Sequence, residues 1–324
     1  MKQRRFTFYL IGSIIIFVLF CILSLNTGPI RIDIFHLGSL TSQQINVLLN
    51  IRMPRLLFAI ALGAVLSVAG AYYQALLHND LAGPYLLGVS SGASFGAVIA
   101  LAFGLSYWIW SFAFVFGIGA FLFILLLARL RNESYLSNLS IILGGVVINS
   151  VLSAGMLIIM LVKGQDVQQI LYWIMGNISY FDLKTGENAL LVALVFTCIS
   201  IFLAHRLNII SLGREEAIST GINYDIEKNL LLTFATIGVA VLVAYTGPIA
   251  FIGLIVPHIL KLILGNDLRF IMPLAFFTGA SVMIAADILA RIILFPMDLP
   301  AGAVTALIGG PFFFLVLIKG KRWT

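Results

Sequence analysis

The sequence predicts an all-α polytopic membrane protein with about ten transmembrane helices. Its 324 residues are 61% hydrophobic and only 10% charged, and the mean hydropathy is +1.10. Soluble domains usually carry about 25% charged residues. Apolar runs of span length recur along the whole chain, and the connections between them are too short to hold a soluble domain. We therefore expect one transmembrane domain over residues 1–324.

The first five expected spans differ in how they begin. The run 6–26 follows basic residues and lacks an obvious small-residue cleavage site, so we expect a retained helix rather than a signal peptide. The run 55–75 opens with two arginines around a proline and is dotted with glycine. A polar break separates it from 84–104, which is rich in small residues. The runs 108–128 and 138–162 follow, and the second contains a Gly-Gly pair.

The last five expected spans complete the bundle. The runs 187–205 and 228–246 flank a polar connection, and 249–264 is interrupted by a proline, which frees backbone groups inside a span. The run 271–290 ends in the sequence ADILAR, and 303–318 closes the series. Small residues at four-residue spacing in several of these runs predict close helix packing.

The basic residues orient the bundle. With the amino terminus inside, most of the 19 Lys and Arg residues fall in cytoplasmic segments, as the positive-inside rule requires. Ten spans then place the carboxy terminus inside as well. This topology explains most of the net charge of +6, so the charge does not indicate nucleic-acid binding.

Two connections are unusually long. Segment 163–186 carries an apolar patch, Ile170–Met175, that is too short to span, so we expect an external or re-entrant helix. Segment 206–227 is the largest cytoplasmic piece, and Gly213 and Gly221 bracket an amphipathic turn or two within it. This segment is either a solvated loop or a docking site for a soluble partner.

Three arginines, Arg52, Arg55 and Arg291, are expected at the outer ends of spans, where they oppose the orientation signal. A helix that starts at Pro54 would place Arg52 and Arg55 near one face. Guanidinium groups there can bind carboxylates of a docking protein or reach lipid headgroups, and the sequence alone does not decide between the two. Asp287 lies four residues before Arg291, which predicts a local ion pair on a helix.

Other chemistry-bearing residues have plain explanations. His258 is expected to pack at a helix end, because no carboxylate lies near it to form a proton relay. The histidines are scattered without ligand spacing, so we expect no metal site, and no Walker A pattern occurs, so we expect no nucleotide hydrolysis by this chain. Cys21 and Cys198 lie in separate apolar runs and are not expected to pair.

Several separated motifs occur along the chain, from the Arg-x-Pro-Arg entry at Arg52–Arg55 to about residue 313. The motif residues in the first half are Gly70, Gln74, Asn79, Leu81, Ala82, Pro84, Gly88, Gly92 and Ala93, and those in the second half include Gly247, Phe251, Gly253, Leu254, Pro257, His258, Gly265, Asp267, Arg269, Asp287, Arg291, Leu299, Pro300, Gly302, Thr305, Ala306, Gly309 and Pro311. Together, and in this order, these motifs resemble the FecCD family of iron-siderophore, haem and vitamin B12 ABC importer permeases. The chain departs from the family pattern at Asp80, Lys261 and Thr220, where proline, arginine and leucine are usual.

The resemblance implies a permease subunit in the bacterial cell membrane. Two such subunits, identical or closely related, would form a pathway, which we expect the second, fifth and eighth spans to line. Two cytoplasmic ATPase subunits, which bind ATP and Mg²⁺, would dock on 206–227, with Gly213, Arg214, Glu215, Ala217 and Gly221 at its core. An extracytoplasmic binding protein, a lipoprotein, would meet Arg52, Arg55 and Arg291. The chain itself would bind no cofactor and no nucleic acid and would catalyse no reaction.

Three functions remain open at this stage. The first is import of a ferric siderophore or related iron chelate, with haem or a corrinoid as the alternative cargo. The second is an ion-coupled secondary transporter, which would require carboxylates near the membrane midplane, and the sequence offers little beyond Asp287. The third is a membrane scaffold or receptor without transport activity.

Overall fold

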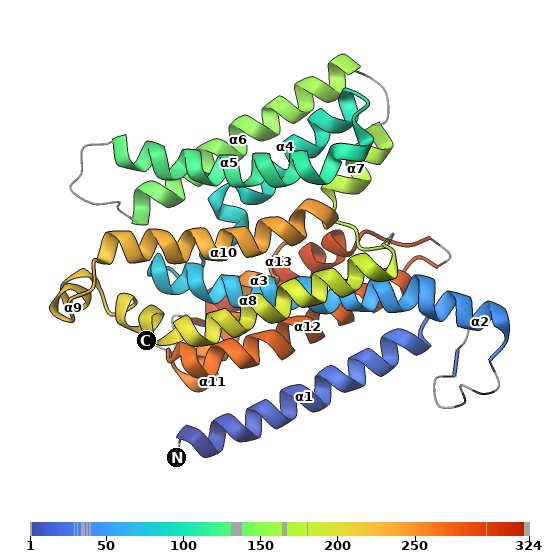
Figure 1. The fold of residues 1–324 in the computed structure, drawn as a ribbon, viewed down its shortest axis with the longest axis horizontal. Coiled ribbons are helices and arrows are strands. Elements are labelled where there is room, and N and C mark those ends of the chain that lie inside the picture. Colours follow the sequence, from blue (N-terminus) through green and yellow to red (C-terminus); the bar gives the residue numbers. More distant parts are fainter. Residues whose placement is uncertain are drawn as a thin grey trace.

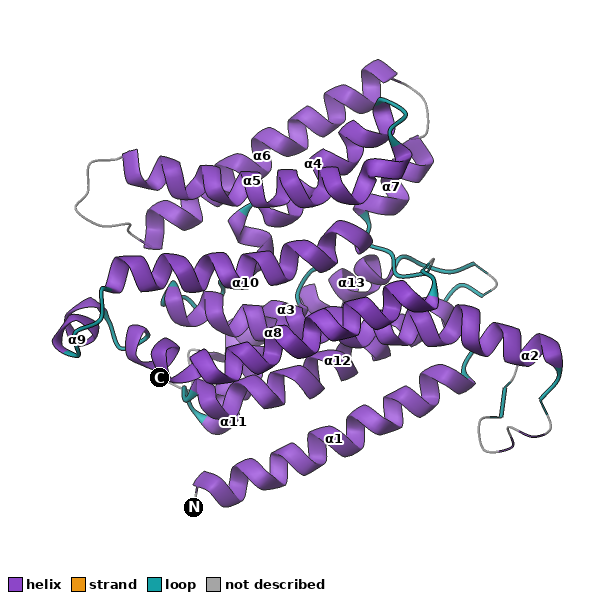
Figure 2. Cartoon of the chain, viewed as in Figure 1, coloured by secondary structure: helices purple, strands orange, loops and turns teal. Residues whose placement is uncertain are grey.

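The computed structural model describes residues 2–320, apart from positions 29, 31, 34, 35, 37, 39, 131–137, 164–166, 180 and 296. Four of the basic residues that determine the predicted membrane orientation lie outside the described residues, namely Arg31, Arg131, Lys321 and Arg322. Within the described part, the regular structure is helical and no strand occurs (Figures 1 and 2).

Ten helices match the ten expected spans in order. They are α1 (Lys2–Asn26), α3 (Met53–Leu76), α4 (Val89–Ala102), α5 (Ile109–Leu130), α6 (Asn138–Lys163), α8 (Leu183–Ile210), α10 (Tyr224–Thr246), α11 (Ile252–Leu264), α12 (Leu268–Ile292) and α13 (Ala301–Gly320). In the described residues, 7 helices are long and apolar enough to cross a membrane, and α4, α11 and the described part of α13 are shorter apolar helices. The number of crossings and the side on which the termini lie stay predictions.

Two helix starts differ from expectation. The second span does not start at Pro54, because α2 (Ser42–Val47) and a π-helical segment (Leu48–Arg52) lead into α3 without a break. The third span does not start as an α-helix at Pro84. A 3-10 helix, η3 (Pro84–Leu87), comes first, and Gly88 at φ 75° then turns the chain into α4. A residue in the left-handed conformation separates the two helical segments, and glycine adopts this conformation without strain.

The short helices fit the two long connections. The apolar patch after α6 forms α7 (Val167–Ile174), which is too short to span, as predicted. Between α8 and α10, the helix α9 (Arg214–Ser219) forms where the two bracketing glycines indicated it. Figure 1 shows α9 at the end of the bundle near the N-terminus, and α7 at the opposite end.

Helix α3 lies at the centre of the bundle, and all of its residues except Met53 and Leu57 are buried. It packs against α8, α10, α11 and α12. Its glycines allow backbones to touch: a Cβ at Gly63 would lie 2.3 Å from the Gly279 oxygen, and a Cβ at Gly70 would lie 1.7 Å from the Gly253 oxygen. The expectation that this second span lines a pathway is therefore wrong, because other helices of the same chain cover its surface.

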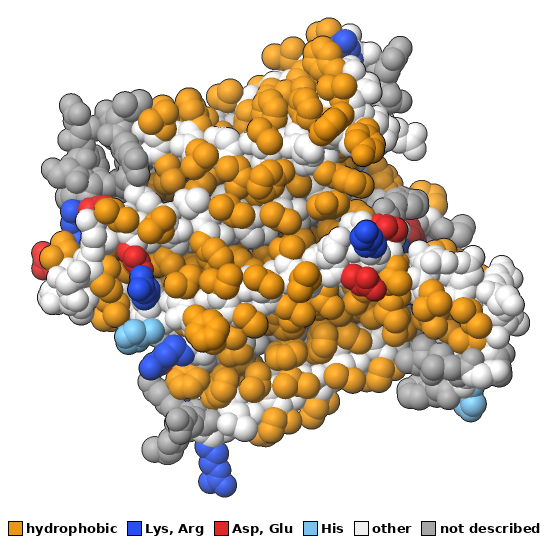
Figure 3. All heavy atoms as spheres, in the orientation of Figure 1, with side chains coloured by type: hydrophobic (Ala, Val, Ile, Leu, Met, Phe, Trp, Pro, Cys, Tyr) orange, Lys and Arg blue, Asp and Glu red, His pale blue; other side chains and the backbone are white. Residues whose placement is uncertain are grey.

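On the outer surface of the bundle, charged and apolar side chains lie in separate regions. On the face in Figure 3, charged side chains gather towards the two ends of the helices and the band between them is hydrophobic. Large apolar side chains such as Val151, Phe202 and Leu307 are 61%, 84% and 73% exposed on α6, α8 and α13. A band of this kind is typical of a protein surrounded by lipid or by further membrane subunits.

Candidate functional site

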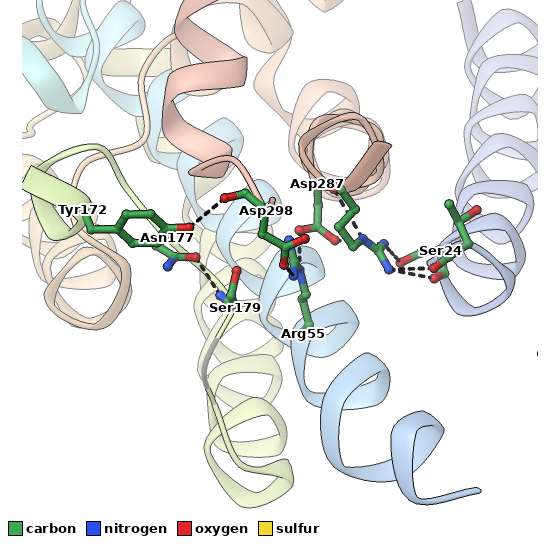
Figure 4. Close-up of polar contacts among 9 residues, drawn as sticks. Ser24, Arg55, Tyr172, Asn177, Ser179, Asp287 and Asp298 are labelled. Atoms are coloured by element: carbon green, nitrogen blue, oxygen red, sulfur yellow. Dashed lines mark hydrogen bonds and ion pairs between the residues drawn. The ribbon is translucent and has the colours of Figure 1, made fainter. Parts of the chain in front are cut away.

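Four charged side chains from three parts of the chain meet at the end of the bundle predicted to face outward (Figure 4). The Nε atom of Arg55 on α3 lies 2.7 Å from Oδ1 of Asp287 on α12, and its Nη1 atom lies 2.6 Å from Oδ2 of Asp298. Arg291 approaches the other oxygen of Asp287, with Nη2 2.9 Å from Oδ2. The local pair predicted for Asp287 and Arg291 is confirmed, and Arg55 joins it.

Two of the arginines also bind the end of α1. Arg291 Nη1 donates to the carbonyl oxygens of Ser24 and Thr27, both at 3.1 Å, and Nη2 donates to the Ser24 hydroxyl at 2.7 Å. Arg52 donates to the carbonyl oxygens of Leu25 and Ile30. The last carbonyls of a helix have no partner within the helix, so these guanidinium groups satisfy them and hold α1 against the bundle.

The outer arginines are not on an open surface. Arg52, Arg55 and Arg291 are 4%, 5% and 7% exposed. In this chain, buried carboxylates and helix-end carbonyls bind the three guanidinium groups. A role in docking stays a prediction, and a direct contact with a partner would require some of these bonds to open.

Sequence patterns did not indicate the remaining members of this cluster. Asp298 lies in the loop between α12 and α13, and its backbone oxygen accepts a hydrogen bond of 2.7 Å from the Tyr172 hydroxyl on α7. No local spacing connects Asp298 with Arg55, since 243 residues separate them. One atom, Arg55 Nη2, is buried and makes no hydrogen bond to the described residues.

The segment between α8 and α10 exposes acidic and apolar side chains and is attached to the bundle by a buried residue and an ion pair. Gly213 at φ 127° and Gly221 at φ 82° begin and end the excursion around α9. Ala217 is fully buried and anchors α9, and Arg214 Nη2 lies 2.9 Å from Asp225 Oδ2 on α10. The outward face of the segment combines acidic and apolar side chains, namely Glu215, Glu216, Leu212 and Ile218, the last two 68% and 53% exposed. A firmly held helix with such a face suits contact with a soluble protein.

The family-motif residues join the loop after α3 to α11. Gln74 Nε2 donates to the Leu254 oxygen at 3.0 Å, and a Cβ at Gly253 would lie 3.2 Å from the Pro84 ring. Asn79 Oδ1 accepts from the Leu81 N–H at 2.9 Å and so closes the turn. These residues hold backbone geometry rather than a ligand.

Other motif residues serve helix packing. Gly92 on α4 faces α5, where a Cβ would lie 2.5 Å from the Phe116 oxygen, and Gly88 supplies the left-handed turn described above. Pro257 is buried inside α11, and His258 beside it is half-buried, as expected for a packed residue. No described carboxylate lies within ion-pair distance of His258.

Two of the residues that depart from the family pattern contact each other. Lys261 Nζ on α11 lies 3.0 Å from Asp80 Oδ1 in the loop after α3. The lysine side chain is 11% exposed and the aspartate side chain 57%. The pair therefore links the same loop to the same helix that the motif residues connect.

The large hollow in the described part of the chain is apolar. It encloses about 640 Å³ between α1, α11, α12 and α13, with Phe8, Ile16, Phe251, Ile259, Val282 and Ile308 among its lining residues. No charged side chain lines this hollow, and the hydroxyls of Ser13, Ser281 and Thr305 in its lining already donate to carbonyl oxygens of their own helices. The described residues also contain no cluster of His, Cys, Asp or Glu suited to a metal ion.

Comparison with known proteins agrees with this architecture. The model of the FecCD transport family matches residues 14–319. The chain is 34% identical over 345 residues to an uncharacterized ABC transporter permease protein, YvrB, of Bacillus subtilis, covering 99% of this chain and 96% of that protein. It is 36% identical over 326 residues to the vitamin B12 import system permease protein BtuC of Yersinia enterocolitica, covering 99% and 95%.

A solved structure gives the same result for the fold. An ABC transporter assigned to the metal-chelate type, in an inward-facing conformation, superposes with a TM-score of 0.86 at 27% identity, over 96% of this chain and 98% of the other. The resemblance drawn from the sequence motifs is confirmed over nearly the whole chain. The protein is a multi-pass component of the bacterial inner membrane and belongs to the FecCD transport family of ABC importer permeases.

Proposed function

We propose that this permease carries a ferric siderophore or a related iron chelate into the cytoplasm by ATP-driven alternating access. The metal-chelate type of the structural neighbour supports a large chelate as cargo. The identity to a vitamin B12 permease supports the alternative, a corrinoid, and haem belongs to the same range of cargo. The motifs that define the family serve helix packing and loop geometry here, so they do not separate these chelates.

The observation that carries the proposal is the projecting segment around α9. Its base is fixed by Ala217 and by the Arg214–Asp225 pair, and its outward face is acidic and apolar. We assign this face to the contact with a cytoplasmic ATPase subunit. Two such subunits, with ATP and Mg²⁺, perform the hydrolysis, and this chain performs no covalent chemistry and holds no cofactor.

The other proposed partners lie in and outside the membrane. A second permease subunit, identical or closely related, packs against exposed apolar helix faces and completes the pathway. An extracytoplasmic binding protein, anchored as a lipoprotein, delivers the chelate to the outer end. The arginine cluster of Arg52, Arg55 and Arg291 supports this surface, since it fixes α1, α3 and α12 relative to one another.

The arrangement of charges argues against the rival ion-coupled transporter. Asp287 is fully buried within α12, and its two oxygens face Arg55 and Arg291 at 2.7 and 2.9 Å. Both oxygens of this carboxylate are thus bound by guanidinium groups of the same chain and are not free to bind a coupling ion. Asp287, the carboxylate that the sequence offered for ion coupling, therefore already binds two arginines.

Binding and uptake measurements test the cargo. The cognate binding protein is mixed with ferric siderophores, haem and cobalamin, and uptake of each bound chelate is compared in cells with and without the permease. Uptake of an iron chelate that disappears with the permease supports the proposal, whereas uptake of cobalamin alone supports the alternative. Uptake of all three without change contradicts the transport function for these cargoes.

A variant of α9 tests the docking face. Ile218→Asp places a charge on the exposed apolar side chain of α9 and should abolish co-purification of the ATPase subunits. Ile45→Asp changes an apolar residue that is similarly exposed, at 43%, on α2 at the opposite end of the bundle (Figure 1), and should leave co-purification unchanged. Equal co-purification of both variants contradicts docking at α9.

A further inference from the structure

His78 has a backbone conformation that residues other than glycine rarely adopt. It follows the end of α3, at φ 48°, and its side chain is exposed on the face predicted to be cytoplasmic. Positive φ values are uncommon for residues with a Cβ and often occur at functional positions, where surrounding contacts hold them. The contacts of His78 therefore need an explanation.

The imidazole of His78 bridges two separate segments. Its Nε2 atom lies 3.2 Å from the Ser211 carbonyl oxygen, just before α9. Its Nδ1 atom lies 3.3 Å from Nδ2 of Asn138, the first residue of α6. The side chain thus connects the base of the docking segment to the start of a transmembrane helix.

A third residue determines which hydrogen bonds His78 makes. Lys228 Nζ on α10 lies 2.5 Å from Asn138 Oδ1. An ammonium group is only a donor, so the amide oxygen of Asn138 must face Lys228 and its NH₂ group must face His78. Nδ1 of His78 then accepts from Asn138, and Nε2 carries the hydrogen that it donates to Ser211. One neutral tautomer satisfies the whole chain of contacts.

The bridge matters because α6 and α9 belong to different parts of the bundle. Helix α6 packs on α4, α5 and η3, whereas α9 packs on α8 and α10 (Figure 1). The contacts through His78 and Asn138 form a short polar connection between these parts. On the other side of the same loop, Asp80 binds Lys261 on α11 and Asn79 closes the turn, so the loop that carries His78 is held from three directions.

We propose that His78 is a positioning residue that transmits displacement of the α9 segment to α6 during transport. This inference rests on the proposed docking of an ATPase subunit at α9. When that subunit moves α9, the carbonyl of Ser211 moves with it, and the imidazole carries the shift to Asn138 and the start of α6. His78 does not need to touch the cargo or the nucleotide.

The test uses the permease assembled with its ATPase subunits in lipid vesicles. Cys21 and Cys198 are replaced by serine, and Leu139→Cys, at an exposed position near the predicted cytoplasmic end of α6, reports the state of that helix through its rate of reaction with a maleimide. The rate is measured without nucleotide and after trapping with ATP and vanadate. The affinity of the ATPase subunits for the permease is measured in parallel.

Two variants break the bridge at different points. His78→Gly removes the side chain and accepts the positive φ without strain. Asn138→Ala removes the hydrogen bond to His78 at the α6 end, together with the one to Lys228, and leaves His78 in place. We expect each variant to reduce the nucleotide-dependent change in labelling about five-fold, which corresponds to the loss of about one hydrogen bond, while ATPase affinity stays the same. His205→Ala, at an exposed histidine on α8, is the matched control and should keep the full response.

The outcomes separate the inference from the proposed function. A full response in both variants with normal ATPase affinity overturns the role of His78 and leaves the docking proposal intact. A weaker ATPase affinity in His78→Gly with a normal response identifies a direct contact instead and also overturns it. If His78→Gly fails to assemble, Asn138→Ala alone decides. If the unaltered permease binds no ATPase subunit, the proposed function fails, and the inference fails with it.

Discussion

Arg55 on α3 and Asp287 on α12 form a buried ion pair, with 2.7 Å between Nε and Oδ1, across 232 residues of chain. Both side chains are almost fully buried, at 5% and 1% exposure. An ion pair in such a position adds little net stability compared with apolar packing, but removing one partner leaves an uncompensated charge. The pair therefore makes the packing of α3 on α12 sensitive to either residue.

Loss of the shared carboxylate should be strongly destabilising. Asp287→Asn leaves Arg55 and Arg291 buried beside a neutral amide and is expected to cost about 3–5 kcal/mol. Asp80→Asn removes a carboxylate that is 57% exposed and is expected to cost about 0–1 kcal/mol. Thermal unfolding in detergent compares the two, and similar midpoints for both variants would contradict the buried-pair account.

The arginine cluster predicts how docking and stability respond together. Arg291→Gln removes bonds to Ser24 and Thr27 and is expected to lower the unfolding temperature, because α1 loses one of the two arginines that hold its end. If the cluster only shapes the outer surface, the affinity of the folded permease for its binding protein falls little. Unchanged stability with a large loss of affinity would instead support direct contact between Arg291 and the partner.

Backbone contact at the centre of the bundle should not tolerate a methyl group. Gly70→Ala places a Cβ 1.7 Å from the Gly253 oxygen, so α3 and α11 must move apart. Overpacking of this kind typically costs about 1–3 kcal/mol. Gly119→Ala on α5 meets nothing within 4 Å and is the matched control, with neutral or slightly raised stability expected from helix propensity. Yield and unfolding temperature measure both.

The contact between Asp80 and Lys261 can be tested by exchange of charge. Asp80→Lys or Lys261→Asp alone places like charges together and should weaken the attachment of the loop after α3 to α11. The double variant restores opposite charges. Because Asp80 is largely exposed, we expect a coupling energy of about 0.2–1 kcal/mol in a double-mutant cycle, decreasing with salt. Strict additivity of the single effects would show that the contact is not energetically meaningful.

The docking segment ends at Gly221, where glycine is required for its positive φ and not because a side chain would clash. Gly221 has φ 82°, and a Cβ there meets nothing within 4 Å. Gly221→Asn should retain coupled ATPase activity and uptake, because asparagine tolerates the left-handed region. Gly221→Pro cannot adopt this conformation and should uncouple ATP hydrolysis from uptake. Equal coupling in the two variants would contradict the role assigned to this turn.

The sequence predicted those features that depend on neighbouring residues. Hydropathy located the helices, the spacing of Asp287 and Arg291 predicted their pair, and Gly213 and Gly221 bracketed α9. Each of these is a property of one short segment. The start of the second span was misplaced because the helix passes through Pro54 after a π-helical segment, a detail that residue propensity does not encode.

The arrangement of the site depends on contacts between distant segments. The sequence placed Arg52, Arg55 and Arg291 at span ends but could not show that Asp298, Ser24 and Leu25 bind them from other parts of the chain. The same limit hid the burial of α3, since its apolar composition suits either lipid or other helices. Likewise, Asp80 and Lys261 were both noted as departures from the family pattern, yet only the fold shows that they meet.

The long separation between Arg55 and Asp287 has a consequence for how the protein is made. At a synthesis rate of about 5–20 residues per second, about 10–50 seconds pass between the emergence of Arg55 and that of its partner. During this interval the arginine belongs to an unfinished membrane bundle, where an unpaired charge is costly in lipid. We expect the nascent chain to require shielding by the insertion machinery until α12 arrives, and chains truncated before α12 to be recognised and degraded.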